Sequence, residues 1–294
     1  MKYFLPLLAI AVAAAAPQGD VVFRSGVSLV RVDVEAVDVN GRVVPGLTKD
    51  DFRILDNGSP QIPGNFSFEE EPLDLILLFD TAGSMRGKIH NVVRATELGF
   101  HELHKGDRVS IRVFTDGSTE ILPFTDNLQA VNEAILIQVL GFRFGGTSKP
   151  EAAAAAAARR FQSEPKTHRK RAVLIVTDKA GARGANELSV VRDLWNADAV
   201  LSELILAGAG QTKLMQTGAG AIVDGTGGAS IVAGDPGEAF RDSVHYVRSG
   251  YTMYYATPDA NSGTERRVQI ELTPEAAKRL PNVRIRARSG YIVP

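Results

Sequence analysis

Hydrophobic and polar residues alternate near the start of the chain. Within residues 27 to 37, apolar side chains at positions 30, 32, 34 and 36 are separated by Arg31, Asp33 and Glu35. A period of two predicts a strand with one buried and one solvent-facing side. An Asp56-Asn57-Gly58 turn then predicts a hairpin, and prolines at 60 and 63 favour an edge strand over residues 61 to 70.

The pattern changes at residue 73. Residues 73 to 79 are almost continuously apolar, which is typical of a strand buried on both faces. Further strands follow, and segments with apolar residues at helical spacing separate them. This alternation predicts an α/β domain over residues 73 to 250, with a doubly wound, mostly parallel sheet of Rossmann-like type. The sequence Ser148-Lys149-Pro150-Glu151 also predicts a capping box ahead of an alanine-rich helix.

Strand-like alternation returns in the C-terminal tail. Apolar positions 268, 270 and 272 share one face, and positions 283, 285 and 287 share another. Residues 20 to 70 and 251 to 294 each offer only a few strands, too few to bury a core of their own. We therefore expect the two segments to pair and form one flanking β-rich module. Asp33 and Glu35 are expected near the arginines of the tail.

The first twenty residues differ from the rest of the chain. Lys2 precedes an apolar run from Tyr3 to Ala16 that is too short to span a bilayer comfortably. Small residues at its end predict a signal peptide over residues 1 to 16, and export to the periplasm, cell envelope or medium. A retained N-terminal anchor is the alternative. No transmembrane segment is expected in the mature chain.

Composition excludes several classes of site and partner. The 294 residues include no cysteine, which rules out disulfides, zinc–thiolate centres and a cysteine nucleophile. A formal net charge of −1 gives no general attraction to nucleic acid.

Side chains with oxygen atoms occupy three segments that each lead into a predicted helix. Asp80 and Ser84 follow the strand that begins at residue 73, Thr147 precedes the alanine-rich helix, and Asp178 ends a later strand. Ligands of open α/β sheets bind at this edge. Two carboxylates and two hydroxyls form a hard oxygen set, which suits Mg²⁺, Mn²⁺ or Ca²⁺.

The motifs DTAGSM, GGTS and IVTD resemble the metal-ion-dependent adhesion site of von Willebrand factor A-type (VWA) domains. The family pattern is D-x-S-x-S, then a threonine, then an aspartate. The flanking stretches VRVDVEAVDVNGRVVPGLTKDDFRILDNGSPQ and VRIRARSGYIVP further resemble the VWA-related secreted proteins of acidobacteria. The resemblance covers nearly all of the chain after the predicted signal peptide.

The resemblance implies a metal site made by Asp80, Ser84, Thr147 and Asp178. Ala82 stands where the family has its first serine, so one direct ligand is missing. Lys179 follows Asp178 where a glycine is usual, which predicts a cation near the site. We expect a binding partner to contact the residues next to this metal site, which are Thr81, Ala82, Gly83, Gly146, Ser148 and Lys179.

The resulting hypothesis is an exported, non-catalytic binding protein of adhesion type. Its partner would be a protein or another envelope ligand, held through an acidic group. One alternative is a structural scaffold subunit with a vestigial metal site. A metal-assisted hydrolase is the other, and it lacks an evident general base beyond the site aspartates.

Overall fold

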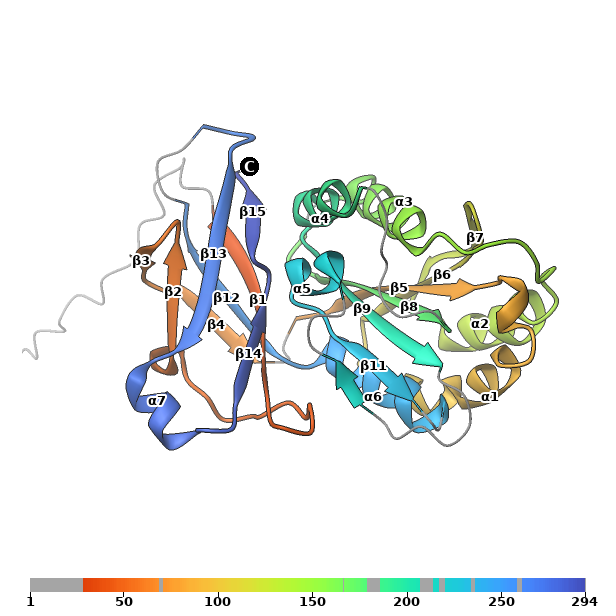
Figure 1. Cartoon of the computed structure of the whole chain (residues 1–294), viewed down its shortest axis with the longest axis horizontal. Helices are drawn as coiled ribbons and strands as arrows, with labels where there is room; N and C mark the ends of the chain where they lie inside the picture. The colour runs from red at the N-terminus through yellow and green to blue at the C-terminus, as the bar shows by residue number, and fades with distance from the viewer. Residues whose placement is uncertain are drawn as a thin grey trace, which may run out of the picture.

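The structure is a computed structural model that describes residues 29–68, 71–165, 167–178, 186–206, 214–216, 220–233, 236–257 and 261–293. The predicted signal peptide lies outside these residues. Two parts lie side by side, a β-sandwich and an α/β domain (Figure 1). Within the described residues, no helix is both long and apolar enough to cross a bilayer.

The α/β domain is built on a seven-stranded sheet with the order β10-β11-β9-β8-β5-β6-β7. The five central strands, from β11 to β6, run parallel, and the outer strands β10 and β7 are antiparallel to their neighbours. In chain order the strands are β5 (Leu73–Asp80), β6 (Arg108–Phe114), β7 (Ser118–Thr125), β8 (Lys170–Thr177), β9 (Ala199–Leu206), β10 (Leu214–Gln216) and β11 (Ser230–Ala233). The sheet confirms the predicted α/β class, although the short strand β10 was not predicted.

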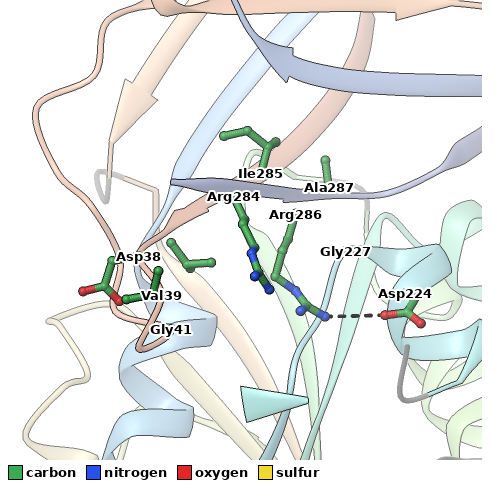
Figure 2. A pocket seen from close by; sticks show the side chains of 10 residues that line it. Asp38, Val39, Gly41, Asp224, Gly227, Arg284, Ile285, Arg286 and Ala287 are labelled. Carbon is green, nitrogen blue, oxygen red and sulfur yellow. Dashed lines mark ion pairs between the residues drawn. The ribbon is translucent and has the colours of Figure 1, made fainter. Parts of the chain in front are cut away.

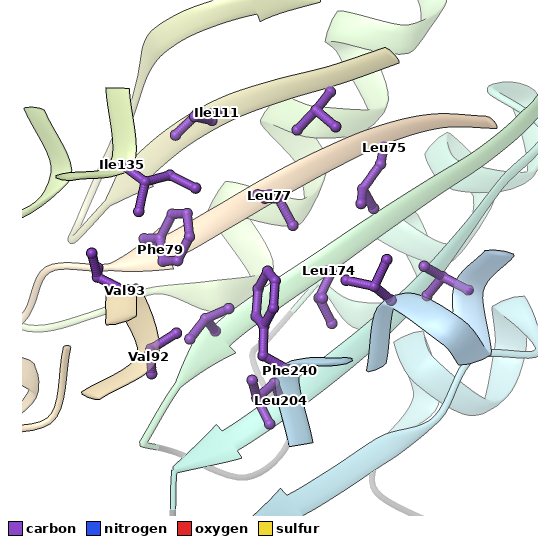
Figure 3. Close-up of a cluster of buried hydrophobic side chains, with 14 of the residues drawn as sticks. Leu75, Leu77, Phe79, Val92, Val93, Ile111, Ile135, Leu174, Leu204 and Phe240 are labelled. Atoms are coloured by element: carbon purple, nitrogen blue, oxygen red, sulfur yellow. The ribbon is translucent and has the colours of Figure 1, made fainter. Parts of the chain in front are cut away.

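Helices cover both faces of this sheet. One face packs on α1 (Ile89–Phe100), α2 (Leu128–Glu133), the π-helix η3 (Ala134–Val139) and α6 (Pro236–Arg248). The other packs on α3 (Pro150–Gln162), α4 (Glu187–Asn196) and α5 (Ala221–Thr226). The buried strand β5 serves both cores: Leu77 and Phe79 face the first set of helices, and Ile76 and Leu78 face the second. Figure 3 shows the first core, where the β5 side chains meet those of α1 and Phe240 of α6.

The β-sandwich contains strands from both ends of the chain. One sheet has the order β14-β1-β12-β4 and the other β15-β13-β2-β3. The strands are β1 (Leu29–Val37), β2 (Phe52–Asp56), β3 (Ser59–Gln61), β4 (Asn65–Phe68), β12 (Tyr251–Ala256), β13 (Glu265–Leu272), β14 (Arg284–Ala287) and β15 (Gly290–Ile292). β1 pairs with β12 and β14, and β2 pairs with β13. The predicted flanking module of N- and C-terminal segments is thus present, with β3 and β4 at sheet edges.

The polar face of β1 is buried, which corrects the prediction of a half-buried strand. Arg31, Asp33 and Glu35 are all buried because this face packs against the α/β domain. Lys170, the first residue of β8, donates hydrogen bonds to Glu35 (2.9 Å) and to the Ser249 carbonyl (2.7 Å). Glu35 lies opposite Arg286 in the strand register, but its ion pair is with Lys170.

The acidic residue Asp33 of β1 has hydrogen-bond partners other than the tail's arginines. Asp33 accepts hydrogen bonds from Arg31 of its own strand (2.9 Å) and from Thr252 (2.9 Å). Arg288 instead donates to the side chain of Asp198 (2.9 Å) and to the Trp195 carbonyl (2.9 Å) of the α/β domain. The polar face of β1 and the tail's arginines both serve to join the two parts of the molecule.

Two local predictions also differ from the structure. The N-cap of α3 is Lys149, so Ser148 lies one residue too early and no capping box forms there. The tail contains a short helix, α7 (Pro274–Arg279), that was not predicted. Its signals are present in the sequence: Thr273 caps it by accepting the Ala276 N–H (3.3 Å), and Pro274 occupies its first turn.

Candidate functional site

Asp80 ends β5 at the carboxyl edge of the parallel sheet, and its side chain is 0% exposed. Its Oδ1 accepts the Ala82 N–H at 2.8 Å. Its Oδ2 accepts the hydroxyl of Thr177, the last residue of the neighbouring strand β8, at 2.7 Å. Neutral donors on both sides therefore fix the carboxylate at the junction of two strand ends.

Asp178 follows Thr177 directly and faces the segment after Asp80. Its Oδ1 accepts the Ser84 hydroxyl at 3.1 Å, and the side chain is 7% exposed. Ser84 lies in the 3₁₀ turn η2 (Gly83–Met85), which starts two residues after Thr81. The structure thus brings Asp80, Ser84 and Asp178 to the same edge, through the contacts of β5 with β8.

Asp178 also has a cationic partner that was not predicted. The Nζ of Lys88 donates to Asp178 Oδ2 at 2.8 Å. The cation expected from the sequence was Lys179, which lies outside the described residues. The signal for Lys88 is weak in the sequence, because a lysine four residues after Ser84 at the start of a helix is usually a solvated residue.

Thr147 reaches the site on a loop that crosses the ends of two strands. The Gly145 N–H donates to the Thr81 carbonyl (2.9 Å), and the Lys149 N–H donates to the Thr115 carbonyl (2.8 Å). Gly146 between them has a φ of +72°, a backbone conformation that favours glycine. These anchors place Thr147, which is exposed, beside the ends of β5 and β6.

The neighbouring residues predicted to face a ligand have different environments. Gly83 and Gly146 are exposed, whereas Ala82 is almost fully buried. The Thr81 hydroxyl donates to the Phe114 carbonyl at 3.0 Å and is buried, so it serves a structural contact with β6. Ser148 is buried, and its Oγ has no hydrogen-bond partner among the described residues.

This donor set fits a small, hard divalent cation. At one edge Ser84 donates to Asp178 and Thr177 donates to Asp80, and the loop of Thr147 is anchored beside this edge. The Ser148 hydroxyl of that loop has no hydrogen-bond partner among the described residues. Mg²⁺ and Mn²⁺ prefer oxygen ligands and retain water in the remaining positions. Within the described residues, no group of three or more His, Cys, Asp or Glu side chains is arranged to hold a metal ion. The candidate site therefore depends on hydroxyls as much as on carboxylates.

A separate cavity lies at the junction of the two parts of the molecule. It has a volume of about 260 Å³ and lies between β14 and the end of α5. Figure 2 shows Arg284 and Arg286 of β14 extending into it, with Arg286 3.6 Å from Asp224. None of the predicted site residues lines this cavity, so it is distinct from the edge that carries Asp80.

Comparison with known proteins identifies the domain. Residues 75–181 match the family model of the von Willebrand factor type A domain. The chain therefore carries a domain of this type, as the resemblance predicted, and the matched range includes Asp80, Ser84, Thr147 and Asp178. The likeness to secreted acidobacterial proteins stays a prediction. A search of curated protein sequences gave no match.

Several solved structures are similar to this chain. One is a von Willebrand factor type A protein from Catenulispora acidiphila, with 14% identity over 93% of this chain and 75% of that chain and a TM-score of 0.48. Another is an aerotolerance-related membrane protein from Bacteroides fragilis, with 16% identity over 60% and 98% and a TM-score of 0.46. A third is the manganese-loaded TRAP protein of Plasmodium vivax, with 13% identity over 72% and 96% and a TM-score of 0.47.

Proposed function

We propose that this protein is a non-catalytic binding module that holds an acidic group of a protein or envelope partner at the edge carrying Asp80. The observation that carries the proposal is the pair of hydrogen bonds across that edge. Thr177 donates to Asp80 and Ser84 donates to Asp178, so two carboxylates and their hydroxyls form one oxygen cluster. Thr147, exposed on the loop that is anchored beside the ends of β5 and β6, is the fourth residue that we assign to this site.

The cluster is suited to weak binding of Mg²⁺ or Mn²⁺, with Ca²⁺ as a third candidate. Asp80 and Asp178 are carboxylates at neighbouring strand ends, and like charges in proximity disfavour each other. A bound divalent ion would supply positive charge there and leave a coordination position for a carboxylate of the partner. Ala82 contributes no oxygen, so water would have to fill its place at some loss of affinity.

Both site aspartates are engaged in ways that disfavour a hydrolase. Asp80 accepts two hydrogen bonds and is fully buried, and Asp178 accepts one hydrogen bond and forms an ion pair. A general base needs a carboxylate oxygen within reach of the proton that it removes.

The scaffold alternative differs only in lacking ion and ligand binding, so the ion response of the purified protein separates it from the present proposal.

Calorimetric titration of the mature protein with Mn²⁺ and Mg²⁺ tests the ion site. We expect weak binding by the wild type and none by Asp80→Asn, because the substitution removes the charge at the centre of the cluster. Asp50→Asn is the matched control, since it makes the same change at an exposed residue of the β-sandwich. An identical ion response from the wild type and Asp80→Asn would mean that the site is vestigial, and the scaffold interpretation would replace this one.

Partner binding provides the second test. Envelope extract passed over the immobilised protein should yield a ligand whose retention requires Mg²⁺ and is lost with Asp80→Asn but not with Asp50→Asn. If neither Mg²⁺ nor Asp80→Asn changes the retention of the ligand, the partner binds to another surface of the protein.

Export belongs to the same proposal. The apolar run from Tyr3 to Ala16, with its small residues at the end, supports cleavage of a signal peptide near Ala14 or Ala15. N-terminal sequencing of the native protein measures this directly. A mature chain that starts at Met1 or Lys2 would contradict export by this route.

A further inference from the structure

Lys88 places a positive charge of the protein itself at the proposed ion site. Its Nζ lies 2.8 Å from Asp178 Oδ2, while Ser84 donates to the other oxygen of the same carboxylate. Both oxygens of Asp178 are therefore engaged from the segment that follows Asp80. An ammonium group and a divalent cation favour the same carboxylate for the same electrostatic reason.

The position of Lys88 is set by the turn that carries Ser84. The Lys88 N–H donates to the Met85 carbonyl at 2.9 Å, and Lys88 is the N-cap residue of α1. Met85 and Ile89 on either side are both fully buried, which fixes the backbone between them. The lysine side chain itself is 39% exposed, so its ammonium can leave Asp178 for water without disturbing the core.

We propose that Lys88 is a built-in competitor of the divalent ion at Asp178. The inference rests on the proposed ion site and adds a regulating residue to it. In the ion-free protein the edge presents an ammonium paired with Asp178. Lys88 must release Asp178 before that carboxylate can take part in holding a divalent ion, so each binding event exchanges one cation for another.

This arrangement has two consequences for the site. It satisfies Asp178 without an ion, so the fold of the edge does not depend on metal. It also lowers ion affinity beyond the loss caused by Ala82, because the Lys88–Asp178 pair has to be broken. A partner carboxylate would oppose this effect, since it can accept the released ammonium or join the ligands of the ion.

Mn²⁺ titration of four proteins tests the competition: wild type, Lys88→Met, Lys88→Arg and Lys149→Met. Lys88→Met keeps an apolar stem of similar length and removes the ammonium, and we expect it to bind Mn²⁺ about three- to fivefold more tightly. Lys88→Arg keeps the charge and should stay near the wild type. Lys149→Met removes an exposed positive charge from the loop that carries Thr147 and should change the affinity less than about twofold.

The possible results separate this inference from the ion site itself. Equal gains for Lys88→Met and Lys149→Met would overturn the competition and leave the ion site standing, because the gain would then reflect net charge alone. No Mn²⁺ binding by either the wild type or Lys88→Met would overturn the ion site and, with it, the role of Lys88. Binding by Lys88→Met alone would be the strongest support for both.

A measurement on the unmodified protein gives an independent check. The NMR signals of the Lys88 side chain should move toward those of a free lysine as Mg²⁺ is added, whereas those of Lys149 should not. Signals of Lys88 that stay fixed while Mg²⁺ binds would show that the ion and the ammonium do not compete.

Discussion

Among the described residues, two aspartates are 0% exposed, Asp56 in the β-sandwich and Asp80 in the α/β domain, and their partners differ in charge. Asp56 accepts hydrogen bonds from the guanidinium of Arg266 (2.6 Å) and from the hydroxyls of Tyr255 (2.9 Å) and Tyr291 (2.8 Å). Asp80 accepts its hydrogen bonds from the Ala82 N–H and the Thr177 hydroxyl, which are neutral donors.

The difference separates a structural carboxylate from a candidate functional one. A buried carboxylate that is paired with a cation of the same chain needs no external counter-ion. Burial, together with the hydrogen bond to Asp56 and its negative charge, raises the pKa of Tyr291 to about 12. Burial, with Tyr291 and Asp56 nearby, also raises the pKa of Tyr255, so both phenols stay donors at neutral pH. Asp80 instead lies at the carboxyl edge of the parallel sheet, where the neighbouring strand β8 leads into Asp178, and it is the residue that we propose to hold a divalent ion.

The largest expected effect comes from breaking the Asp56 cluster. Asp56→Ala leaves the two tyrosine hydroxyls and Arg266 without their shared acceptor, and we expect a loss of about 3–5 kcal/mol in the free energy of unfolding. Asp80→Asn should cost only about 1 kcal/mol, because it alters hydrogen bonds to neutral donors. Urea unfolding of both variants measures the difference. Similar losses would show that the two aspartates do not differ in the way described.

Lys170 tests how firmly the two parts of the molecule are joined. It forms a buried pair with Glu35 across the junction, with both side chains about 5% exposed. Lys170→Met should cost about 3 kcal/mol, because it removes the cation from a desolvated pair.

A second ion pair across the same junction provides the control. Arg192 of α4 and Glu265 of β13 lie 2.7 Å apart but are largely exposed. Arg192→Met should therefore change stability by less than about 0.5 kcal/mol in the same urea experiment. A large loss for Arg192→Met, or none for Lys170→Met, would contradict the role assigned to burial.

Ala82→Ser sharpens the comparison at the Asp80 edge. The added hydroxyl supplies the ligand that the family pattern has at this position and replaces a water without the entropy of ordering it. We expect ion binding to strengthen by about 1 kcal/mol, which is roughly fivefold. Mn²⁺ calorimetry measures it, and Gly83→Ser, which places the hydroxyl at the adjacent exposed position, is the control. Equal effects from the two serines would show that position 82 has no special role.

The last predicted effect concerns pH and Asp51 of the sandwich. The backbone N–H of Thr48 lowers the pKa of Asp51, burial opposes this, and Arg279 of α7 lowers the pKa further. Because the folded-state pKa lies below the unfolded value of about 3.9, the stabilisation is complete above that pH and is lost as pH falls through the folded pKa.

Asp51→Asn should therefore lower stability by at most about 1 kcal/mol at pH 7. The difference from the wild type should shrink toward zero in strongly acidic solution, as thermal unfolding across pH 2–7 would measure. A difference that stays constant with pH would mean that the charge of Asp51 does not contribute.

The sequence alone determined the class of the fold and the position of the Asp80 edge. Continuous apolar runs such as residues 73 to 79 indicate strands buried on both faces, and alternation at both ends of the chain predicts paired flanking segments. Carboxyl ends of parallel strands share one edge, so the sequence pattern alone predicts that Asp80 and Asp178 lie at the same edge. These inferences succeed because they depend on the local period and on topology.

Only the tertiary structure decided which charged residues meet. The polar face of β1 has the pattern of a solvated face, and its burial depends on where Lys170 of a distant strand lies. Lys88 contacts Asp178 across 90 residues of sequence, while Ser148 misses the cap of α3 by a single position. A side-chain ion pair carries no periodic signal, because its geometry is set by packing between segments that are far apart in the chain.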